Sequence, residues 1–166
     1  MTCIVADSGP LIMLGRSGLL GHLRQIAGTI LVPATVFAEC TRDANKPGAS
    51  VLIVALASKL IHVEPSPAPP LSTAAHLDAG EIEALTMAHH RACPVLMDES
   101  LGRKVAVQLG IKVLGSAGIL LIAKERQLIS EVAPILRDWK SWGYFLSPSL
   151  IESVLSRAGE RQSLGD

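Results

Sequence analysis

The 166-residue chain has few aromatic residues and no net charge. Phe, Trp and Tyr make up only 3% of it, so we expect an aliphatic core. Charged residues amount to 18%, below the quarter that is usual for globular proteins, while 49% of the residues are hydrophobic. This composition excludes a disordered chain, which would be rich in charge and poor in apolar residues. Fifteen basic residues balance fifteen acidic ones, so no basic excess indicates a nucleic-acid-binding protein.

The chain also lacks a long hydrophobic run. The longest stretch without a charged residue, Gln25–Ala38, is interrupted by Pro33 and is shorter than the roughly 18–20 apolar residues that span a bilayer. The first residues include no basic segment of the kind that begins a signal peptide. We therefore expect a soluble cytoplasmic protein with no membrane partner.

Cysteine is scarce as well. Cys3, Cys40 and Cys93 are odd in number and scattered, and no two of them are separated by only two residues. This spacing predicts neither a disulfide framework nor a zinc knuckle. His89 and His90 lie near Cys93, but their spacing does not match the usual zinc fingers.

Short aliphatic runs alternate with helical patterns through most of the chain. The runs are rich in Ile, Val and Leu without polar alternation, which is typical of strands buried on both faces. Strands are predicted at Cys3–Ala6, Thr29–Val32, Leu60–Glu64, Pro94–Met97 and Ile111–Leu114. Helices are predicted at Leu11–Leu14, Gly18–Ile26, Pro33–Thr41, Ala49–Ser58, Asp78–His90, Glu99–Leu109 and Ser116–Arg126, and an extended loop at Pro65–Pro70. The alternation predicts an α/β fold in which helices flank a parallel sheet of about five strands.

The strand pattern ends after Gln127, and two further helices are predicted at Pro134–Trp142 and Pro148–Arg157. Four of the five aromatic residues lie within the seven residues from Trp139 to Phe145. They either pack this helical hairpin onto the rest of the domain or form a surface for a partner or a second copy. We expect one domain over residues 1–158, with residues 127–158 as its C-terminal extension and residues 159–166 as a tail, in which residues 161–166 are frayed.

Acidic residues follow two of the predicted strands. In an open parallel sheet, ligands bind beyond the carboxyl ends of the strands. Asp7 follows the first strand, with Ser8 beside it, and Asp98 follows the fourth, with Glu99 beside it. Both aspartates also precede helices, so helix capping is the alternative role for each of them. A dinucleotide site is excluded because no glycine-rich fingerprint follows the first strand.

Two more candidate acids lie on predicted helices. Glu39 follows the second strand, and Glu81 opens a later helix. Asp78 and Glu81 have the spacing of a capping box, which is the structural alternative for Glu81. Glu83 lies roughly 200° around the helix from Glu81, so the two do not easily serve one metal ion. We prefer Glu81, which is nearer the core side of the helix, and keep Glu83 in reserve.

Four acids at one edge of a sheet would repel one another and raise their pKa values unless a cation lay among them. A cluster of oxygen ligands suits Mg²⁺ or Mn²⁺ better than zinc. Such a cation activates water and neutralises charge that develops on a phosphodiester.

Four segments of the sequence resemble PIN-domain ribonucleases, in particular the VapC-like toxins of prokaryotic toxin–antitoxin pairs. They are Ile4–Leu11, Val32–Glu39, Leu77–Leu85 and Pro94–Glu99, and their order and spacing match across roughly residues 3–125. The later part of the chain, from Ala123–Arg126 through Tyr144 to Pro148, resembles a little-characterised bacterial and archaeal branch of that superfamily.

The resemblance implies a three-layer PIN-like fold and a metal-dependent hydrolysis of RNA phosphodiester bonds. The four acids of the family fall on Asp7, Glu39, Glu81 and Asp98, which would bind Mg²⁺ or Mn²⁺. Asp7 and Asp98 would be the main metal ligands, and Ser8, Glu83 and Glu99 would support them. The third acid is usually Asp in the family. The Thr or Ser that often precedes the fourth acid is absent here, since Leu96 and Met97 stand in its place.

RNA binding requires cations near the acids. The candidates are Arg16, Arg42, Lys46, Arg103 and Lys104, and solvation at the surface is the alternative role for each of them. The resemblance also implies a homodimer and a small protein antitoxin, one arginine of which would enter the acidic pocket. The alternative hypothesis is a non-catalytic PIN-like module that binds RNA or a protein partner.

Overall fold

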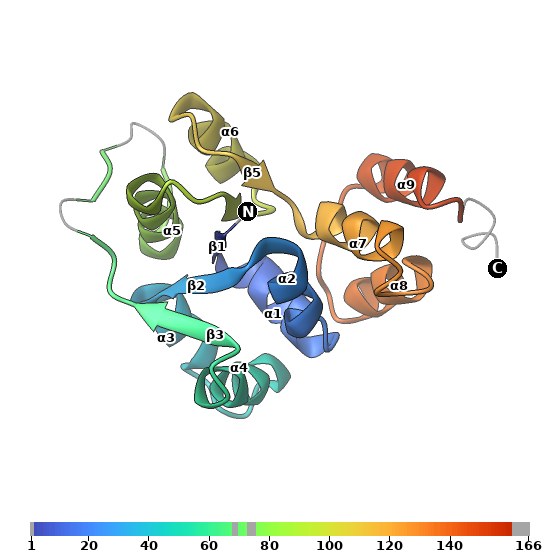
Figure 1. The fold of residues 1–166 in the computed structure, drawn as a ribbon, viewed down its shortest axis with the longest axis horizontal. Coiled ribbons are helices and arrows are strands. Elements are labelled where there is room, and N and C mark those ends of the chain that lie inside the picture. The colour runs from blue at the N-terminus through green and yellow to red at the C-terminus, as the bar shows by residue number, and fades with distance from the viewer. Residues whose placement is uncertain (1, 68–69, 73–75, 161–166) are drawn as a thin grey trace. The chain divides into compact units, whose positions relative to one another are not determined.

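The computed structural model describes residues 2–67, 70–72 and 76–160, and in them five parallel strands form one sheet (Figure 1). The strands are β1 (Cys3–Ala6), β2 (Thr29–Pro33), β3 (Ile61–Glu64), β4 (Val95–Leu96) and β5 (Val113–Leu114). Their order in the sheet is β3-β2-β1-β4-β5. The predicted α/β fold with a parallel sheet is therefore confirmed.

The helices lie close to the predicted positions, with boundaries shifted by a few residues. They are α1 (Ser8–Arg16), α2 (Leu20–Ala27), α3 (Ala34–Thr41), α4 (Pro47–Ala57), α5 (Ala79–Arg91), α6 (Ser100–Gln108), α7 (Ser116–Glu125), α8 (Ala133–Ser141) and α9 (Pro148–Arg157). Helix α1 begins three residues before the predicted Leu11, because Pro10 is tolerated within a first helical turn. Pro33 does not begin a helix as predicted. It ends β2, paired with Glu64, and precedes α3 as its N-cap.

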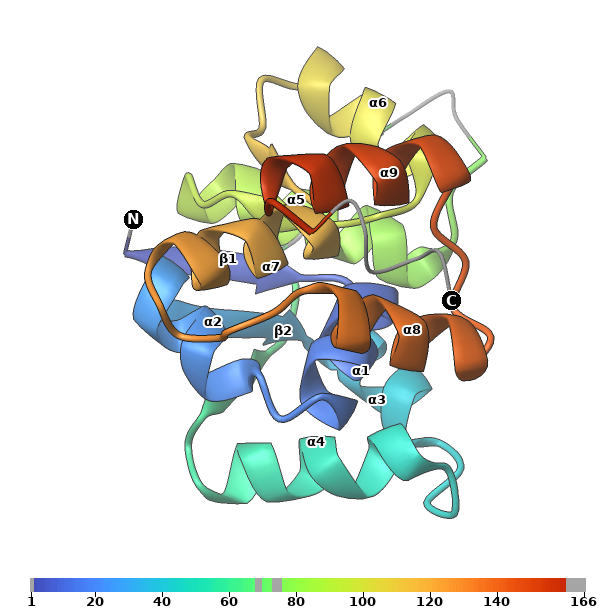
Figure 2. The same cartoon turned by 90° about the vertical axis from the view of Figure 1, so that its right-hand side faces the viewer.

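The sheet separates two layers of helices, α5 and α6 on one face and α1, α2 and α4 on the other (Figure 2). Val5, Leu31 and Val95 belong to a buried cluster that also contains residues of α5 and α6. Their neighbours Ile4 and Ile30 are fully buried and, by the alternation of side chains along a strand, face the opposite layer. The strands thus read as continuous apolar runs because both faces are covered, and polar residues begin where the strands end.

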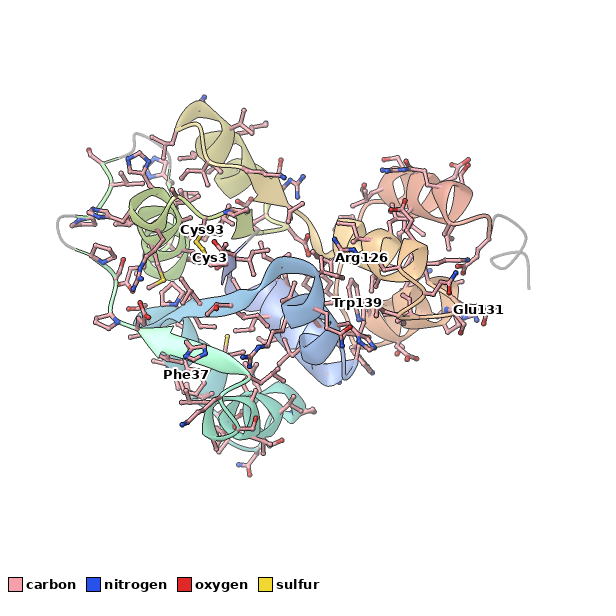
Figure 3. The ribbon with its side chains drawn as sticks, viewed as in Figure 1. Cys3, Phe37, Cys93, Arg126, Glu131 and Trp139 are labelled. Carbon is pink, nitrogen blue, oxygen red and sulfur yellow. A yellow bond between two sulfur atoms is a disulfide. The ribbon has the colours of Figure 1, made fainter. Side chains whose placement is uncertain are left out.

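A disulfide joins Cys3, at the beginning of β1, to Cys93, just before β4 (Figure 3). The expectation that the cysteines form no disulfide is therefore wrong. The two residues are 90 positions apart in the chain, and their Cα atoms lie 5.7 Å apart because β1 and β4 pair side by side. Sequence spacing alone contains no trace of this pairing. Cys40 is free and buried.

The chain divides into two compact units, Met1–Ser116 and Ala117–Asp166. The first contains the sheet and α1–α6, and the second contains α8, α9 and nearly all of α7. Within the second unit, Glu160 is buried, although it belongs to the predicted tail beyond the domain. It accepts hydrogen bonds from Lys124 Nζ, Val132 N and Ala133 N and so caps the start of α8. The rest of the expected tail, residues 161–166, lies outside the described residues, as do residues 68–69 of the predicted loop.

Among the described residues, no helix combines the length and hydropathy needed to cross a membrane.

Candidate acidic site at the carboxyl edge of the sheet

Asp7 follows β1 directly and is buried, with only 6% of its surface exposed. Its backbone N–H donates to Leu96 O at 3.0 Å, which fixes the end of β1 against the end of β4. Although Asp7 occupies the N-cap position of α1, its side chain makes no capping hydrogen bond. The alternative role of helix capping therefore does not explain why a carboxylate is buried here.

The pKa of Asp7 is raised from 3.8 to about 7. Burial is the largest cause, because removing a carboxylate from water disfavours its charged form. A hydrogen bond from the Ser8 backbone lowers the pKa, while the nearby charges of Glu81, Asp78 and Glu39 raise it further. Asp7, just after β1, and acids from α3 and the start of α5 thus lie within electrostatic reach of one another.

Asp78 and Glu81 form the predicted capping box at the start of α5. The Asp78 carboxylate accepts from Glu81 N at 2.8 Å, and the Glu81 carboxylate accepts from Asp78 N at 2.9 Å. The pKa of Glu81 is nevertheless raised, first by burial and then by the charges of Asp78, Glu99 and Glu39, against the lowering effect of its bond to Asp78 N. The capping role and membership of the acidic cluster are therefore compatible in Glu81.

Glu39 lies on α3 and packs its carboxylate against Gly80 of α5. A Cβ atom at position 80 would stand 2.7 Å from Glu39 Oε2, so the missing side chain of this glycine allows the approach. Burial raises the pKa of Glu39, Asp78 and Glu83 raise it further, and Arg42 lowers it. The sequence reasoning treated Asp78 only as a cap, yet its charge acts on three acids of the cluster. No feature of the sequence distinguishes an aspartate that only caps a helix from one that also acts on nearby acids.

Met97 separates Asp98 from the end of β4, and the first residue of α7 holds the Asp98 carboxylate. Its Oδ1 accepts from Ser116 N at 2.8 Å, and its Oδ2 accepts from Ser116 Oγ at 2.5 Å. Capping of α6 falls instead to Glu99, which accepts from Gly102 N at 2.7 Å. Ser116 thus supplies a hydroxyl to the fourth acid, although neither Leu96 nor Met97 has one. The sequence reasoning missed Ser116, whose only signal was its place two residues after the end of the fifth strand.

Asp98 shares a hollow with two of the cations considered for RNA binding. This open hollow beside α6 is lined by Asp98, Ser100, Arg103, Lys104, Val107 and Gln108. Arg103 Nη1 donates to Met97 O at 2.9 Å, which fixes the guanidinium near the end of β4. Arg42 acts on Glu39 electrostatically, and Lys46 is the exposed N-cap residue of α4. Arg16 lies in the last turn of α1, at the end of the helix away from Asp7.

The free Cys40 lies close enough to Asp7 and Glu39 for their charges to act on its thiol. Burial, together with these charges, raises the pKa of Cys40 to about 12. The thiol therefore stays protonated at neutral pH and is no nucleophile.

The acids match a divalent cation in the type of donor. All are hard oxygen ligands. The pKa of Asp7 is raised first by burial and further by the charges of Glu81, Asp78 and Glu39, and a cation would offset those charges. In the described part of the chain, no three His, Cys, Asp or Glu side chains are already arranged around a common metal position. Glu81 and Asp98 are turned to Asp78 N and Ser116, and these hydrogen bonds hold them.

The structure is thus a parallel α/β domain with several acids beyond the carboxyl ends of its strands. A family profile described as a PIN domain matches residues 3–160, and the chain belongs to that family. PIN domains are in general metal-dependent nucleases that use divalent metals.

The chain is also similar, at low sequence identity, to solved structures. One is a PilT N-terminus domain protein from the archaeon Sulfolobus solfataricus P2, with 16% identity, a TM-score of 0.47, and coverage of 71% of this chain and 90% of that one. Another is a domain of a functionally unknown protein from Methanocaldococcus jannaschii, with 15% identity, a TM-score of 0.48, and coverage of 69% and 91%. No curated protein matches the chain.

Proposed function

We propose that the protein is a Mg²⁺- or Mn²⁺-dependent endoribonuclease that hydrolyses RNA phosphodiester bonds. The observation that carries this proposal is Asp7, a buried carboxylate whose pKa is raised to about 7 among Glu81, Asp78 and Glu39 in a PIN domain. Buried acids that destabilise one another are costly to keep in a fold unless they serve a site. A divalent cation would neutralise their charge, and the cation-bound protein would be the active form.

Asp7 and Asp98 would be the main ligands of the cation, with Glu39 and Glu81 ligating directly or through water. When bound, the cation supplies activation of water and neutralisation of the charge that develops on the phosphate. Glu39 or Glu81, whose pKa values are raised first by burial, would be the carboxylate that accepts a proton from the attacking water. Ser116 would keep Asp98 oriented through its hydroxyl and amide.

Supporting residues would adjust this site through their charges. Ser8 bonds Asp7 through its backbone, Glu83 acts on Glu39, and Glu99 acts on Glu81. Arg103 and Lys104 line the hollow that contains Asp98, where they can pair with RNA phosphates. Arg42, Lys46 and Arg16 are the remaining candidates for contacts with the RNA backbone.

In the cell, the protein would act in the cytoplasm as the toxin of a toxin–antitoxin pair. The small protein antitoxin would inhibit it by placing an arginine among the carboxylates, where a bidentate pair would form in place of the cation. The acidic cluster supports this mode of inhibition. The charges of Glu81, Asp78 and Glu39 add to the effect of burial on the pKa of Asp7, and a guanidinium would offset them.

Cleavage of single-stranded RNA in the presence of Mn²⁺ tests the proposal. We expect cleavage by the wild-type protein, and loss of cleavage in Asp98→Asn with the fold intact by circular dichroism. Asp138→Asn, at an exposed position of α8, is the matched control and should cleave like the wild type. Equal cleavage by wild type and Asp98→Asn would refute the proposal.

The second candidate function is a non-catalytic PIN-like module that binds RNA or a protein. It is favoured by the fact that, among the described residues, the acids are not already arranged around a metal position. Thermal melts separate the two, because a cation that binds the native state raises the midpoint. The module predicts equal midpoints with and without Mn²⁺.

A further inference from the structure

Figure 3 shows the Cys3–Cys93 disulfide in yellow, and Cys93 also lines a hollow that the acidic site does not use. The hollow has a volume of about 360 Å³ and is lined by the end of α5 and by the segment between α6 and β5. Among the described residues of its lining, His89 and Lys112 can carry positive charge and none is acidic. The hollow therefore favours a small anionic molecule beside Cys93.

The two cysteines of the bridge differ in their surroundings. Cys93 is buried against the core and lines the hollow, whereas Cys3 is half-buried near the start of the chain. Thr2 Oγ1 donates a hydrogen bond to Cys3 Sγ at 4.0 Å. A thiolate that attacks one sulfur of a disulfide forms a mixed disulfide with it and expels the other sulfur. Attack from the hollow on Cys93 would thus expel Cys3, whose sulfur the Thr2 hydroxyl would stabilise.

The bridge would stand in a reducing compartment if the protein acts in the cytoplasm, as we propose above. Cytoplasmic thiols keep most cysteines reduced, and the disulfides that form there are usually transient. A bridge of this kind, next to a hollow that favours anions, is open to exchange with a small anionic thiol.

The bridge also joins the far ends of two elements that carry acids. Cys3 begins β1, and Asp7 follows the other end of that strand. Cys93 lies two residues after α5, whose N-cap residue is Asp78. Ala92 links α5 to Cys93 with a φ of 50°, in the left-handed region that alanine rarely adopts. Such a conformation persists only where the surrounding structure holds it, so opening the bridge would let the end of α5 relax.

We propose that the Cys3–Cys93 disulfide is an exchange site for a small thiol that carries a carboxylate, and that exchange there loosens α5 and weakens cation binding at the acidic site. The thiol enters the hollow as its thiolate, its sulfur bonds to Cys93 Sγ, and Cys3 Sγ leaves with the electron pair of the S–S bond and takes a proton from water. A second thiol displaces the first from Cys93, so both cysteines end as thiols and the two small molecules end as one disulfide. The effect on the cation rests on the proposed function, whereas the exchange does not.

Mapping of the mixed disulfide tests where exchange takes place. The wild-type protein is treated briefly with mercaptoacetate, and a maleimide is then added to trap the thiol that is released. We expect tandem mass spectrometry to find mercaptoacetate on Cys93 and the maleimide on Cys3. Mercaptoacetate on Cys3, or a bridge that mercaptoacetate does not open, would overturn the proposal.

The rates of reduction by two small thiols test the attraction of an anion to the hollow. Lys112→Glu should slow reduction by mercaptoacetate at least about fivefold and leave reduction by uncharged mercaptoethanol unchanged. Lys140→Glu is the matched control, because Lys140 is exposed on α8 and does not line the hollow, and it should be reduced like the wild type by both thiols. Equal slowing in the two variants would attribute the effect to net charge and exclude the hollow as the entry site.

Two measurements on the reduced and desalted protein test the effect on the acidic site. Calorimetry should give an affinity for Mn²⁺ about tenfold below that of the oxidised protein. Hydrogen exchange in the presence of a chelator should be faster at the amide of Glu81, which donates to Asp78 at the start of α5. Cys93→Ser, which lacks the bridge, should match the reduced wild type with or without a reductant.

The outcomes separate this proposal from the proposed function. Equal affinity and equal hydrogen exchange in the oxidised and reduced proteins would overturn the effect on the site and leave the proposed function in place. If neither form binds Mn²⁺, the proposed function fails, while faster exchange at Glu81 would still support the loosening of α5. A reduced protein that is unfolded by circular dichroism would overturn the proposed loosening, because loss of the whole fold would then account for any loss of affinity.

Discussion

Replacing Asp7 by Asn should stabilise the cation-free protein above neutral pH. Asp7 has a pKa of about 7 in the folded chain, against an ordinary value of 3.8. Because the folded-state pKa is raised, the stability associated with the protonated form is fully present below pH 3.8 and is lost as the pH rises through 7. A pKa that differs by one between the folded and unfolded chain changes the free energy of unfolding by about 1.36 kcal/mol, so the full difference is about 4 kcal/mol. Asn has the shape of the acid without its charge and avoids this loss.

Urea denaturation in the presence of a chelator, at pH 4 and at pH 8, measures the effect. We expect the free energy of unfolding of Asp7→Asn to match that of the wild type near pH 4 and to exceed it by about 2–4 kcal/mol at pH 8. Asp138→Asn is the control for the chemical change, and its exposed position predicts no pH-dependent gain. Adding Mn²⁺ at a hundredfold excess over its dissociation constant should return about 2.7 kcal/mol to the wild type and nothing to Asp7→Asn.

Two results would refute this reasoning. In the first, the difference in free energy of unfolding between Asp7→Asn and the wild type is the same at pH 8 as at pH 4. This would mean that burial and the acidic neighbours do not destabilise charged Asp7. In the second, Mn²⁺ increases the free energy of unfolding equally in both proteins, which would mean that the cation binds elsewhere.

Three other predictions concern the disulfide, the buried Glu160 and the approach of Glu39 to Gly80. Cys93→Ser should lower the free energy of unfolding by up to roughly 4–5 kcal/mol, because the disulfide to Cys3 closes a loop of 90 residues. A reductant should lower the free energy of unfolding of the wild type to that of the variant and leave the variant unchanged. Glu160→Ala should cost about 2–3 kcal/mol in urea denaturation, since it leaves two buried amides and a lysine without their acceptor; an unchanged midpoint would contradict the capping role. Gly80→Ala should weaken Mn²⁺ binding about tenfold, measured by calorimetry, with little change in the free energy of unfolding. The reason is that the added Cβ would displace the end of the Glu39 side chain. An unchanged affinity for Mn²⁺ would exclude Glu39 from the site.

The parallel sheet could be predicted from the sequence because its strands are buried on both faces. Their unbroken aliphatic runs, as in Thr29–Pro33, contrast with the amphipathic segments between them, and α9 has the predicted bounds. The predicted boundaries of helices and strands were less accurate where one residue suits both the end of a strand and the start of a helix. Pro33 satisfies both the end of a strand and the first turn of a helix, and the pairing of β2 with β3 decides between them.

The candidate site could be predicted only in part. Position after a strand identified Asp7, and capping-box spacing identified Asp78 and Glu81, because both signals are local. The contacts of Ser116 with Asp98 and the disulfide of Cys3 could not be predicted, since they join residues brought together by strand order alone. Sequence spacing does not encode which strands are neighbours.

The most direct test of the metal site is a crystal soaked in Mn²⁺ at a concentration that supports RNA cleavage, with anomalous diffraction recorded at the manganese edge. The account predicts a peak about 2 Å from carboxylate oxygens of Asp7, with Asp98, Glu39 or Glu81 completing the ligands directly or through water. A peak away from Asp7, or no peak at all while the protein still cleaves RNA, would contradict it.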